Sequence, residues 1–171
     1  PDLHFTFPTI KTSDMGSDHT PVSLDFSKEW REMLLQQGPY ILISDWMKRM
    51  GKTEADFNKQ AIITGNESDD LAKKLIMMSS QGGYKISLIW LPERMNLTSA
   101  NKILKLLEEP PHQTLFILVS ENPELLLETI RSRAQRIDFK KIETQEIEKA
   151  LVERRALQPE MAHRIARIAN G

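Results

Sequence analysis

The sequence predicts an α/β fold in which helices flank a central parallel sheet and a short all-helical part follows. Two apolar runs, Tyr84 to Leu91 and Leu115 to Val119, have the length and composition of buried strands. An amphipathic helical pattern lies between them, and only helical patterns remain after Phe139. Continuous apolar strands are typical of parallel sheets, so we expect the strand at Leu115 to Val119 to be covered on both faces.

The N-terminal part is predicted to begin with a strand. Leu3 to Pro8 alternates as a strand does, and a polar segment over residues 12–21 is predicted to be a loop. Two short helices follow. Ser27 is the expected cap of the first, which ends at Gly38-Pro39, and the second runs from about Ser44 to Gly51. Their expected inward residues are Trp30, Met33, Leu34, Trp46, Met47 and Met50.

The middle of the chain leads into the first apolar run. The patch Ala61 to Ile63 fits either a strand or a helix start. Ser68 is the expected cap of a helix, and Gly82-Gly83 then turns the chain into the strand at Tyr84. The expected inward residues of this helix are Leu71, Leu75 and Met78.

The stretch from Ala100 to Arg136 has the clearest pattern. One face of its first helix is apolar, and Pro110-Pro111 ends that helix because proline disfavours helical backbone in the residue before it. Asn122-Pro123 is the expected start of the next helix, with the asparagine side chain as cap, and a strand is expected from Ile137 to Phe139. The apolar face of the first helix consists of Ala100, Ile103, Leu104 and Leu107.

Two helices are predicted to complete the chain. Thr144 is the expected cap of one, and Pro159 occupies the first turn of the other. Because the pattern changes to helices only, we expect a domain boundary between Lys140 and Glu143. The expected domains are therefore an α/β part over residues 1–139 and the start of a helical domain over residues 144–171.

Composition excludes several classes of protein. With 171 residues the chain is long enough for one domain or slightly more, and with no cysteine it has neither disulfides nor cysteine-ligated zinc. A net charge of −1 gives no global attraction to nucleic acid. Without a long apolar run or a signal-like start, we expect no membrane contact and a cytoplasmic location. The start at Pro1, without methionine, indicates an excised piece of a longer protein.

Two candidate sites fail on spacing. Gly51-Lys52-Thr53 looks like the end of a phosphate-binding loop, but the motif needs another glycine where Trp46 stands, so a helix end with solvated charges explains it better. The histidines have no pair at the i, i+4 spacing of a helical metal site, so no metal is expected. They are His4, His19, His112 and His163.

Two groups of charged residues each have two possible explanations: the acids before Pro110-Pro111 and the arginines at positions 131, 133 and 136. Glu108 and Glu109 lie at a helix C-terminus, where the dipole disfavours carboxylates, so they either point into water or meet a positive partner. Arg131, Arg133 and Arg136 either neutralise a helix end or present planar donors to a phosphate or carboxylate.

The motif run assigns the chain to a family by resemblance. "LLEEPP" at residues 106–111 and "NPELLLETIRSR" at residues 122–133 closely resemble bacterial clamp-loader subunits of DNA polymerase III, which are AAA+ ATPases. The resemblance is strong from Tyr84 to Phe139 and weak in the flanks. It implies a partial AAA+ domain of the phosphate-loop type through residue 139, followed by the first helices of a small helical lid. Residues 9–64 receive no role from it.

Within the family the chain resembles the delta prime branch, which does not hydrolyse ATP. Active members carry an acidic pair after the strand to hold magnesium and polarise water, whereas Trp90 and Leu91 stand at the matching places. "YKISLIWLPERMN" at residues 84–96 also fits this branch, and "PDLHFTFP" at residues 1–8 resembles the segment after its zinc module. The phosphate-binding loop and a possible zinc module would lie upstream of Pro1.

The resemblance also implies the site residues. Ser132-Arg133-Ala134 matches the Ser-Arg-Cys motif of the family, in which the arginine reaches ATP bound by the neighbouring subunit. Arg133 is therefore the expected arginine finger and Ser132 its motif neighbour. Ala134 replaces the cysteine, which leaves the charge of the guanidinium intact. The sensor position at the end of the strand corresponds to Ser120 or Glu121.

The implied protein is a non-hydrolysing subunit that helps to place the sliding clamp on primed DNA. No cofactor is expected in this chain, because ATP and magnesium would be held by the neighbour. Expected partners are gamma/tau-type and delta subunits and, indirectly, the clamp and primed DNA, all within the DNA polymerase III holoenzyme, a nucleotidyltransferase complex. The alternatives are an ATP-hydrolysing gamma/tau-like subunit, a stand-alone nucleic-acid-binding module, or a structural domain in which Arg133 has no function.

Overall fold

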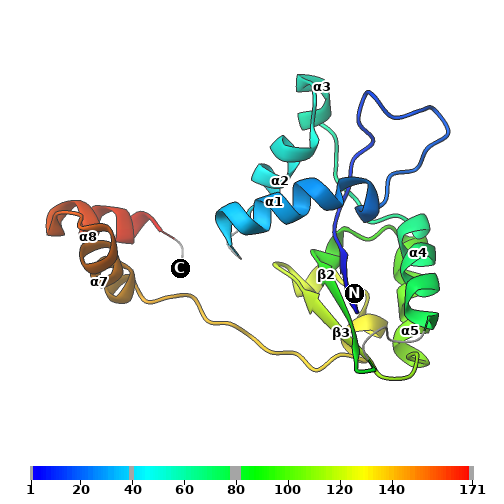
Figure 1. Cartoon of the computed structure of the whole chain (residues 1–171). Helices are drawn as coiled ribbons and strands as arrows, with labels where there is room; N and C mark the ends of the chain where they lie inside the picture. Colours follow the sequence, from blue (N-terminus) through cyan, green and yellow to red (C-terminus); the bar gives the residue numbers. More distant parts are fainter. Residues whose placement is uncertain (1, 39–40, 78–81, 170–171) are drawn as a thin grey trace. The chain divides into compact units, whose positions relative to one another are not determined.

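The structure is a computed structural model that describes residues 2–38, 41–77 and 82–169. The chain forms two compact units, Pro1–Ala134 and Gln135–Gly171 (Figure 1). The larger unit holds a parallel sheet with helices around it, so the predicted fold class is confirmed. The division into an AAA+ domain over residues 1–139 and a lid over residues 144–171 stays a prediction.

The sheet has three parallel strands in the order β1-β2-β3. They are β1 (Leu3–Thr6), β2 (Lys85–Trp90) and β3 (Thr114–Val119), and each lies where its sequence pattern predicts a strand. Leu3 lies opposite Ile86, which in turn lies opposite Leu115. Because all strands point the same way, their carboxyl ends meet at one edge of the sheet.

Helical segments connect the strands. Between β1 and β2 lie the 3-10 turn η1 (Ser23–Phe26) and the helices α1 (Ser27–Gln37), α2 (Ile43–Met50), α3 (Glu54–Phe57) and α4 (Gly65–Ile76). Between β2 and β3 lie η2 (Pro92–Arg94) and α5 (Leu97–Glu108). After β3 the chain forms η3 (Pro123–Leu125) and the single turn α6 (Glu128–Arg131). Pro39 and Met78, assigned above to a helix end and a helix interior, lie outside the described residues.

Two hydrophobic clusters hold the larger unit together. One lies between the sheet and the pair α4 and α5, which run beside each other in Figure 1. The other joins α1 and α2 to the ends of β1 and β2. The first contains Ile63, Leu71, Leu75, Ile89 and Ile103. The second contains Phe7, Ile10, Phe26, Trp30, Met33, Ile41, Trp46, Met50, Ala61, Trp90 and Leu91.

Strand β3 is covered on one face only, so the expectation that both faces are covered is wrong for this chain. Leu115, Ile117 and Val119 are 48%, 38% and 44% exposed, while the residues between them are half-buried. Successive side chains of a strand point to opposite faces. One set faces the layer of α4 and α5, and the other set stays partly exposed to solvent.

Tertiary contacts override two predicted caps. Phe26 rather than Ser27 precedes the first turn of α1, because η1 runs directly into that helix. Helix α4 begins before Ser68, whose hydroxyl lies 2.7 Å from that of Ser99 in α5. A side chain at Gly65, the first residue of α4, would lie 2.8 Å from the Thr98 methyl carbon, so this glycine permits the close packing of α4 on α5.

The segment after β3 also differs from its prediction. The helix expected after Asn122 is split into η3 and α6 by extended backbone at Leu126 and Leu127, and the Asn122 side chain makes no cap hydrogen bond. Ile137 to Phe139 forms no strand. A strand needs a neighbour for its backbone N–H and C=O groups, and the described residues offer it none. The undecided patch Ala61 to Ile63 forms isolated bridges at Ile62 and Ile63 rather than a strand or a helix.

The smaller unit is a pair of helices, α7 (Thr144–Arg155) and α8 (Pro159–Ile168). Pro159 opens α8 as predicted, whereas the predicted cap Thr144 already lies inside α7. Ala162 and Ala166 are fully buried between the two helices, and His163 Nδ1 lies 3.0 Å from Glu148 Oε2. In the described part of the chain every helix is too short or too polar to cross a lipid bilayer.

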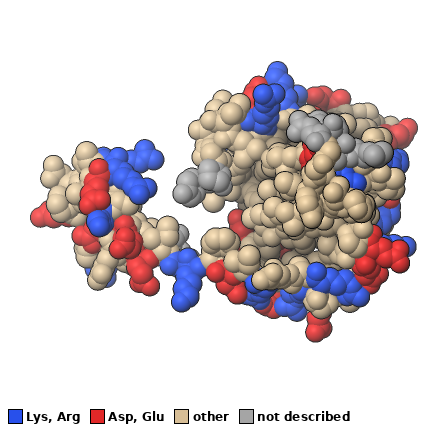
Figure 2. Space-filling view, turned by 60° about the horizontal axis from the view of Figure 1, so that its bottom comes forward, with Lys and Arg blue, Asp and Glu red and all other residues tan. Residues whose placement is uncertain are grey.

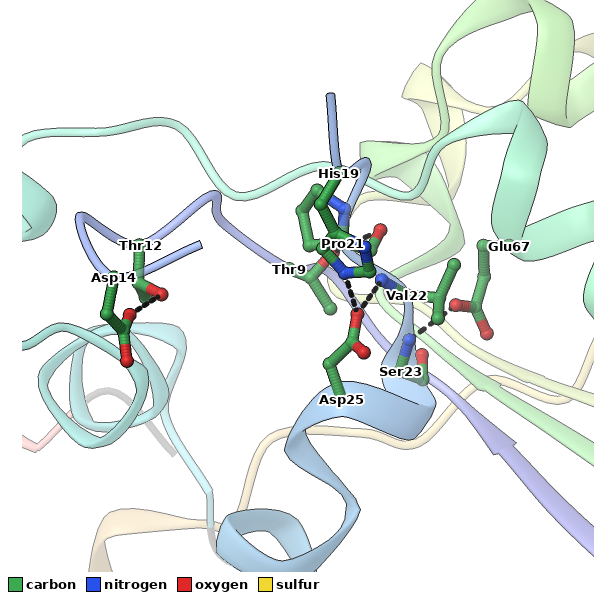
Figure 3. A network of polar contacts seen from close by, with 9 residues as sticks. All are labelled: Thr9, Thr12, Asp14, His19, Pro21, Val22, Ser23, Asp25 and Glu67. Carbon is green, nitrogen blue, oxygen red and sulfur yellow. Dashed lines mark hydrogen bonds and ion pairs between the residues drawn. The ribbon is translucent and has the colours of Figure 1, made fainter. Parts of the chain in front are cut away.

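A buried carboxylate ties α4 to the N-terminal half of the larger unit (Figure 3). Glu67 accepts hydrogen bonds from the Thr6 hydroxyl at 3.2 Å and from the Ser23 backbone N–H at 2.5 Å. The Ser23 hydroxyl in turn accepts from the Phe7 N–H at 3.0 Å. Burial raises the pKa of Glu67, while the Ser23 and Thr6 hydrogen bonds and the nearby Lys74 charge oppose this rise.

The buried Glu67 should make the free energy of unfolding depend on pH, and Glu67→Gln should remove this dependence. Because the folded-state pKa lies above the unfolded value of 4.5, the folded state binds the proton more tightly. Stability of the wild-type chain relative to the variant should therefore fall as pH rises from about 4.5 through the raised pKa. Urea unfolding between pH 4 and 8, followed by tryptophan fluorescence, measures this, since all three tryptophans lie in the larger unit. If the free energy of unfolding changed with pH in the same way in both proteins, the proposed effect of Glu67 would be contradicted.

Candidate functional site

The carboxyl end of β2 is apolar and buried. Trp90 is 8% exposed and Leu91 is 2% exposed, and Leu91 has left-handed backbone with φ at 54°. Non-glycine residues adopt this conformation rarely, so the surrounding packing must stabilise it. The two positions that the family resemblance aligns with an acidic pair are thus part of the hydrophobic core.

Aromatic side chains from α1 and α2 pack over this end of the sheet. The Trp30 ring lies 5.2 Å from Trp90 and 4.3 Å from Phe7, and the Trp46 ring lies 5.1 Å from Trp30. The Trp46 indole N–H donates to the Pro8 carbonyl at 2.8 Å. Ligands of open α/β sheets usually bind outside the carboxyl ends of the strands. Here that region beside β1 and β2 is filled by side chains of residues 9–64, to which the family resemblance assigns no role.

Glu93 links the carboxyl ends of β2 and β3. One oxygen of its carboxylate accepts from the backbone N–H groups of Glu121 at 2.9 Å and Asn122 at 3.1 Å. Sequence reasoning missed this residue, because a contact across 28 positions leaves no local pattern. Of the two sensor candidates, Ser120 has a buried hydroxyl without a partner among the described residues, whereas Glu121 is engaged through its backbone.

Arg133 lies just beyond α6 and is held by its own chain. Its Nη1 donates to the Thr129 carbonyl at 2.9 Å and to the Ser132 hydroxyl at 3.3 Å. Its Nη2 lies 2.8 Å from Glu108 Oε1, and the side chains of Arg133 and Glu108 are 36% and 42% exposed. The Ser132 hydroxyl itself donates to the Thr129 carbonyl. The expected site residues Ser132 and Arg133 are therefore joined in one small network, and Glu108 has a positive partner.

The other two arginines of the motif are engaged elsewhere. Arg131 pairs with Glu124 inside the larger unit. Arg136 lies in the smaller unit, where its Nε is 2.8 Å from Asp138. Each of the three arginines thus pairs with a different carboxylate.

The structure supports the interpretation of Gly51-Lys52-Thr53 as a helix end rather than a phosphate-binding loop. Gly51 follows the last residue of α2, and its N–H donates to the Met47 carbonyl at 2.9 Å. A Cβ at Gly51 would lie 2.6 Å from the Phe57 ring, so glycine is needed for packing. Lys52 pairs with Asp14 at 3.1 Å. Within the described ranges no cluster of three metal-binding side chains occurs.

Trp90→Asp tests whether the end of β2 can accept an acid. The change should lower the free energy of unfolding by about 3–5 kcal/mol, because it removes a buried aromatic ring and places a carboxylate among apolar side chains. Trp90→Phe is the control, and it should cost about 1–2 kcal/mol. Urea unfolding followed by circular dichroism compares the two. An unchanged midpoint for Trp90→Asp would contradict the placement of this residue in the core.

Comparison with known proteins places these motifs in a family. A family model described as "DNA polymerase III, delta subunit" matches residues 45–143, which is 99 of 171 residues. The delta prime subunit of DNA polymerase III from Bacillus subtilis is 37% identical over 86 residues, which cover 50% of this chain and 26% of that protein. The delta prime subunit from Yersinia pestis is 48% identical over 65 residues, which cover 37% of this chain and 18% of that protein.

A relative of another subunit type is equally similar. The tau subunit from Bacillus subtilis is 38% identical over 82 residues, which cover 48% of this chain and 15% of that protein. The chain thus spans about a quarter of its Bacillus delta prime relative and less of the other two. Because the family model matches more than half of the chain, the chain belongs to the DNA polymerase III delta-subunit family, and its predicted membership among the clamp-loader proteins is confirmed.

Proposed function

We propose that this chain is part of a non-hydrolysing clamp-loader subunit of the delta prime type, which supplies Arg133 to ATP bound by a neighbouring ATPase subunit. The full protein then helps to place the sliding clamp on primed DNA during replication. Its expected neighbours are gamma/tau-type and delta subunits of the DNA polymerase III holoenzyme. The delta prime relatives and the matched motif run support this proposal.

The apolar end of β2 is the observation that carries the non-hydrolysing role. Hydrolysis of ATP requires carboxylates that hold magnesium and orient water. At the matching positions this chain has Trp90 and Leu91, both buried against the aromatic side chains of α1 and α2. An acid could stand there only if the cluster of Trp30 and Phe7 were disrupted. We therefore propose that this chain contributes no magnesium ligand and that ATP, magnesium and their chemistry belong to the neighbour.

The position of Arg133 supports a role in trans. A guanidinium has five N–H donors. In Arg133 the two donors on Nη1 bond Thr129 and Ser132, and Nη2 forms an ion pair with Glu108. The Nε–H and one Nη2–H have no partner among the described residues. They suffice for a bidentate contact with two phosphate oxygens, which a partly exposed arginine at the end of a helical turn can offer to another chain.

The gamma/tau-like alternative deserves a test because the Bacillus tau relative matches as well as the delta prime relative does. An active ATPase binds nucleotide by itself. We expect no heat of ATP binding when the full-length subunit alone is titrated with ATP and magnesium in a calorimeter. A gamma/tau-type subunit is the positive control, and saturable binding by the subunit that contains this chain would favour the alternative.

A stand-alone nucleic-acid-binding role has little support. The face of the molecule in Figure 2 shows a broad uncharged area on the larger unit with basic and acidic residues mixed around it. Nucleic-acid binding relies on a basic patch that neutralises phosphates. The net charge of −1 agrees with the mixed surface.

Arg133→Ala in the full-length subunit tests the proposed function. In the reconstituted loader, ATP turnover at the site that Arg133 serves should fall on the order of 10³-fold, the lower end of the effect of known arginine fingers. DNA-stimulated phosphate release measures it. Arg136→Ala is the matched control, since Arg136 pairs with Asp138 in the other unit, and it should leave turnover unchanged. Unchanged turnover in Arg133→Ala would rule out the proposed role.

A further inference from the structure

The two motifs of this chain meet in space. Glu108 is the last residue of α5 and belongs to the Leu-Leu-Glu-Glu-Pro-Pro run, and Arg133 follows α6 in the Ser-Arg-Ala motif. Their side chains form an ion pair at 2.8 Å across 25 positions of sequence. Nothing in either motif alone requires this contact.

Glu108 has no evident role in its own helix. A carboxylate in the last turn faces the negative end of the helix dipole, which is an unfavourable place for it. Both acids of the motif are exposed, but of the two only Glu108 has an ion pair in the described part of the chain. The contact with Arg133 is therefore the one interaction that explains an acid at this position.

The contacts of Arg133 fix the plane of its guanidinium. Thr129 and Ser132 hold Nη1 from the α6 side, and Glu108 holds Nη2 from the α5 side. Without the third contact both remaining anchors lie on one nitrogen, and the side chain can pivot about it. A long side chain loses rotamer freedom when it binds, and fixing it beforehand removes that cost from the binding step.

We propose that Glu108 is a positioning residue for Arg133, which holds the guanidinium ready to bind a phosphate of the neighbouring subunit's nucleotide. This inference rests on the proposed function of Arg133. The Nε–H and the second Nη2–H stay available for the phosphate, so Glu108 need not leave when the phosphate binds. Because both side chains are more than one third exposed, water screens the repulsion between the carboxylate and the phosphate.

Glu108→Gln in the full-length subunit tests this role. In the reconstituted loader we expect turnover at saturating ATP to fall about three- to tenfold, the range that corresponds to one newly mobile long side chain, with little change in KM. Glu109→Gln is the matched control, because its side chain forms no ion pair in the described chain, and it should leave turnover unchanged. Glu108→Asp keeps the charge and should recover part of the loss. Glu108→Gln should also fold normally, since it removes an unfavourable charge from a helix C-terminus.

The double variant Glu108→Gln/Arg133→Ala tests whether Glu108 acts through Arg133 or lowers turnover by another route. If Glu108 acts through Arg133, Glu108→Gln should lower turnover no further when Arg133→Ala is already present. An equal fold-change in both backgrounds, or unchanged or faster turnover in Glu108→Gln alone, would overturn the proposal while leaving the role of Arg133 intact.

Chemical modification tests the contact without relying on turnover. Phenylglyoxal reacts with accessible arginines, and peptide mass spectrometry of the full-length subunit reports the rate at each site. Glu108→Gln should speed the modification of Arg133 severalfold and leave Arg131 and Arg136, which pair with Glu124 and Asp138, unchanged. An unchanged rate at Arg133 would overturn the proposal. If Arg133→Ala leaves turnover unaffected, the proposed function fails. The rate of phenylglyoxal modification at Arg133 then still decides whether Glu108 holds the Arg133 side chain.

Discussion

The packing of Trp30 between Phe7 and Trp90 is the interaction on which the larger unit depends. Phe7 follows β1, Trp90 ends β2 and Trp30 lies in α1, so one ring joins two strands to a helix from another part of the chain. Aromatic rings bury large apolar areas and have preferred contact geometries, so they can fix the position of a whole segment. Here they place α1 and α2 over the carboxyl ends of the strands.

This packing also determines what the site can do. An open α/β sheet normally leaves the carboxyl ends of its strands free for ligands. In this chain Trp90 and Leu91 instead pack in one hydrophobic cluster with side chains of α1 and α2, and they offer no polar group there. The proposed site lies at the corner between α5 and α6. There, Arg133 and Glu108 are partly exposed and held in a defined arrangement.

Polar contacts between distant segments complete the architecture. Glu93, in the turn after β2, accepts a hydrogen bond from the backbone just after β3. Glu67 in α4 accepts hydrogen bonds from Thr6 and Ser23, two residues that are far from it in the sequence. Both are carboxylates that accept backbone N–H groups, which would otherwise lack partners in these irregular segments. Each contact spans more than 25 positions, so local sequence patterns do not reveal it.

The sequence by itself determined the three strands of the sheet, the helix α5 and its end at the prolines, because apolar periodicity and proline act within a few residues. It also determined the family, through the motifs around Glu108 and Arg133, and the absence of acids at Trp90 and Leu91. Tertiary structure alone decided that α4 begins at Gly65, that the helix after Asn122 is split, and that one face of β3 is exposed. It alone brought Glu108 to Arg133, because a contact between two helix ends depends on how those helices pack.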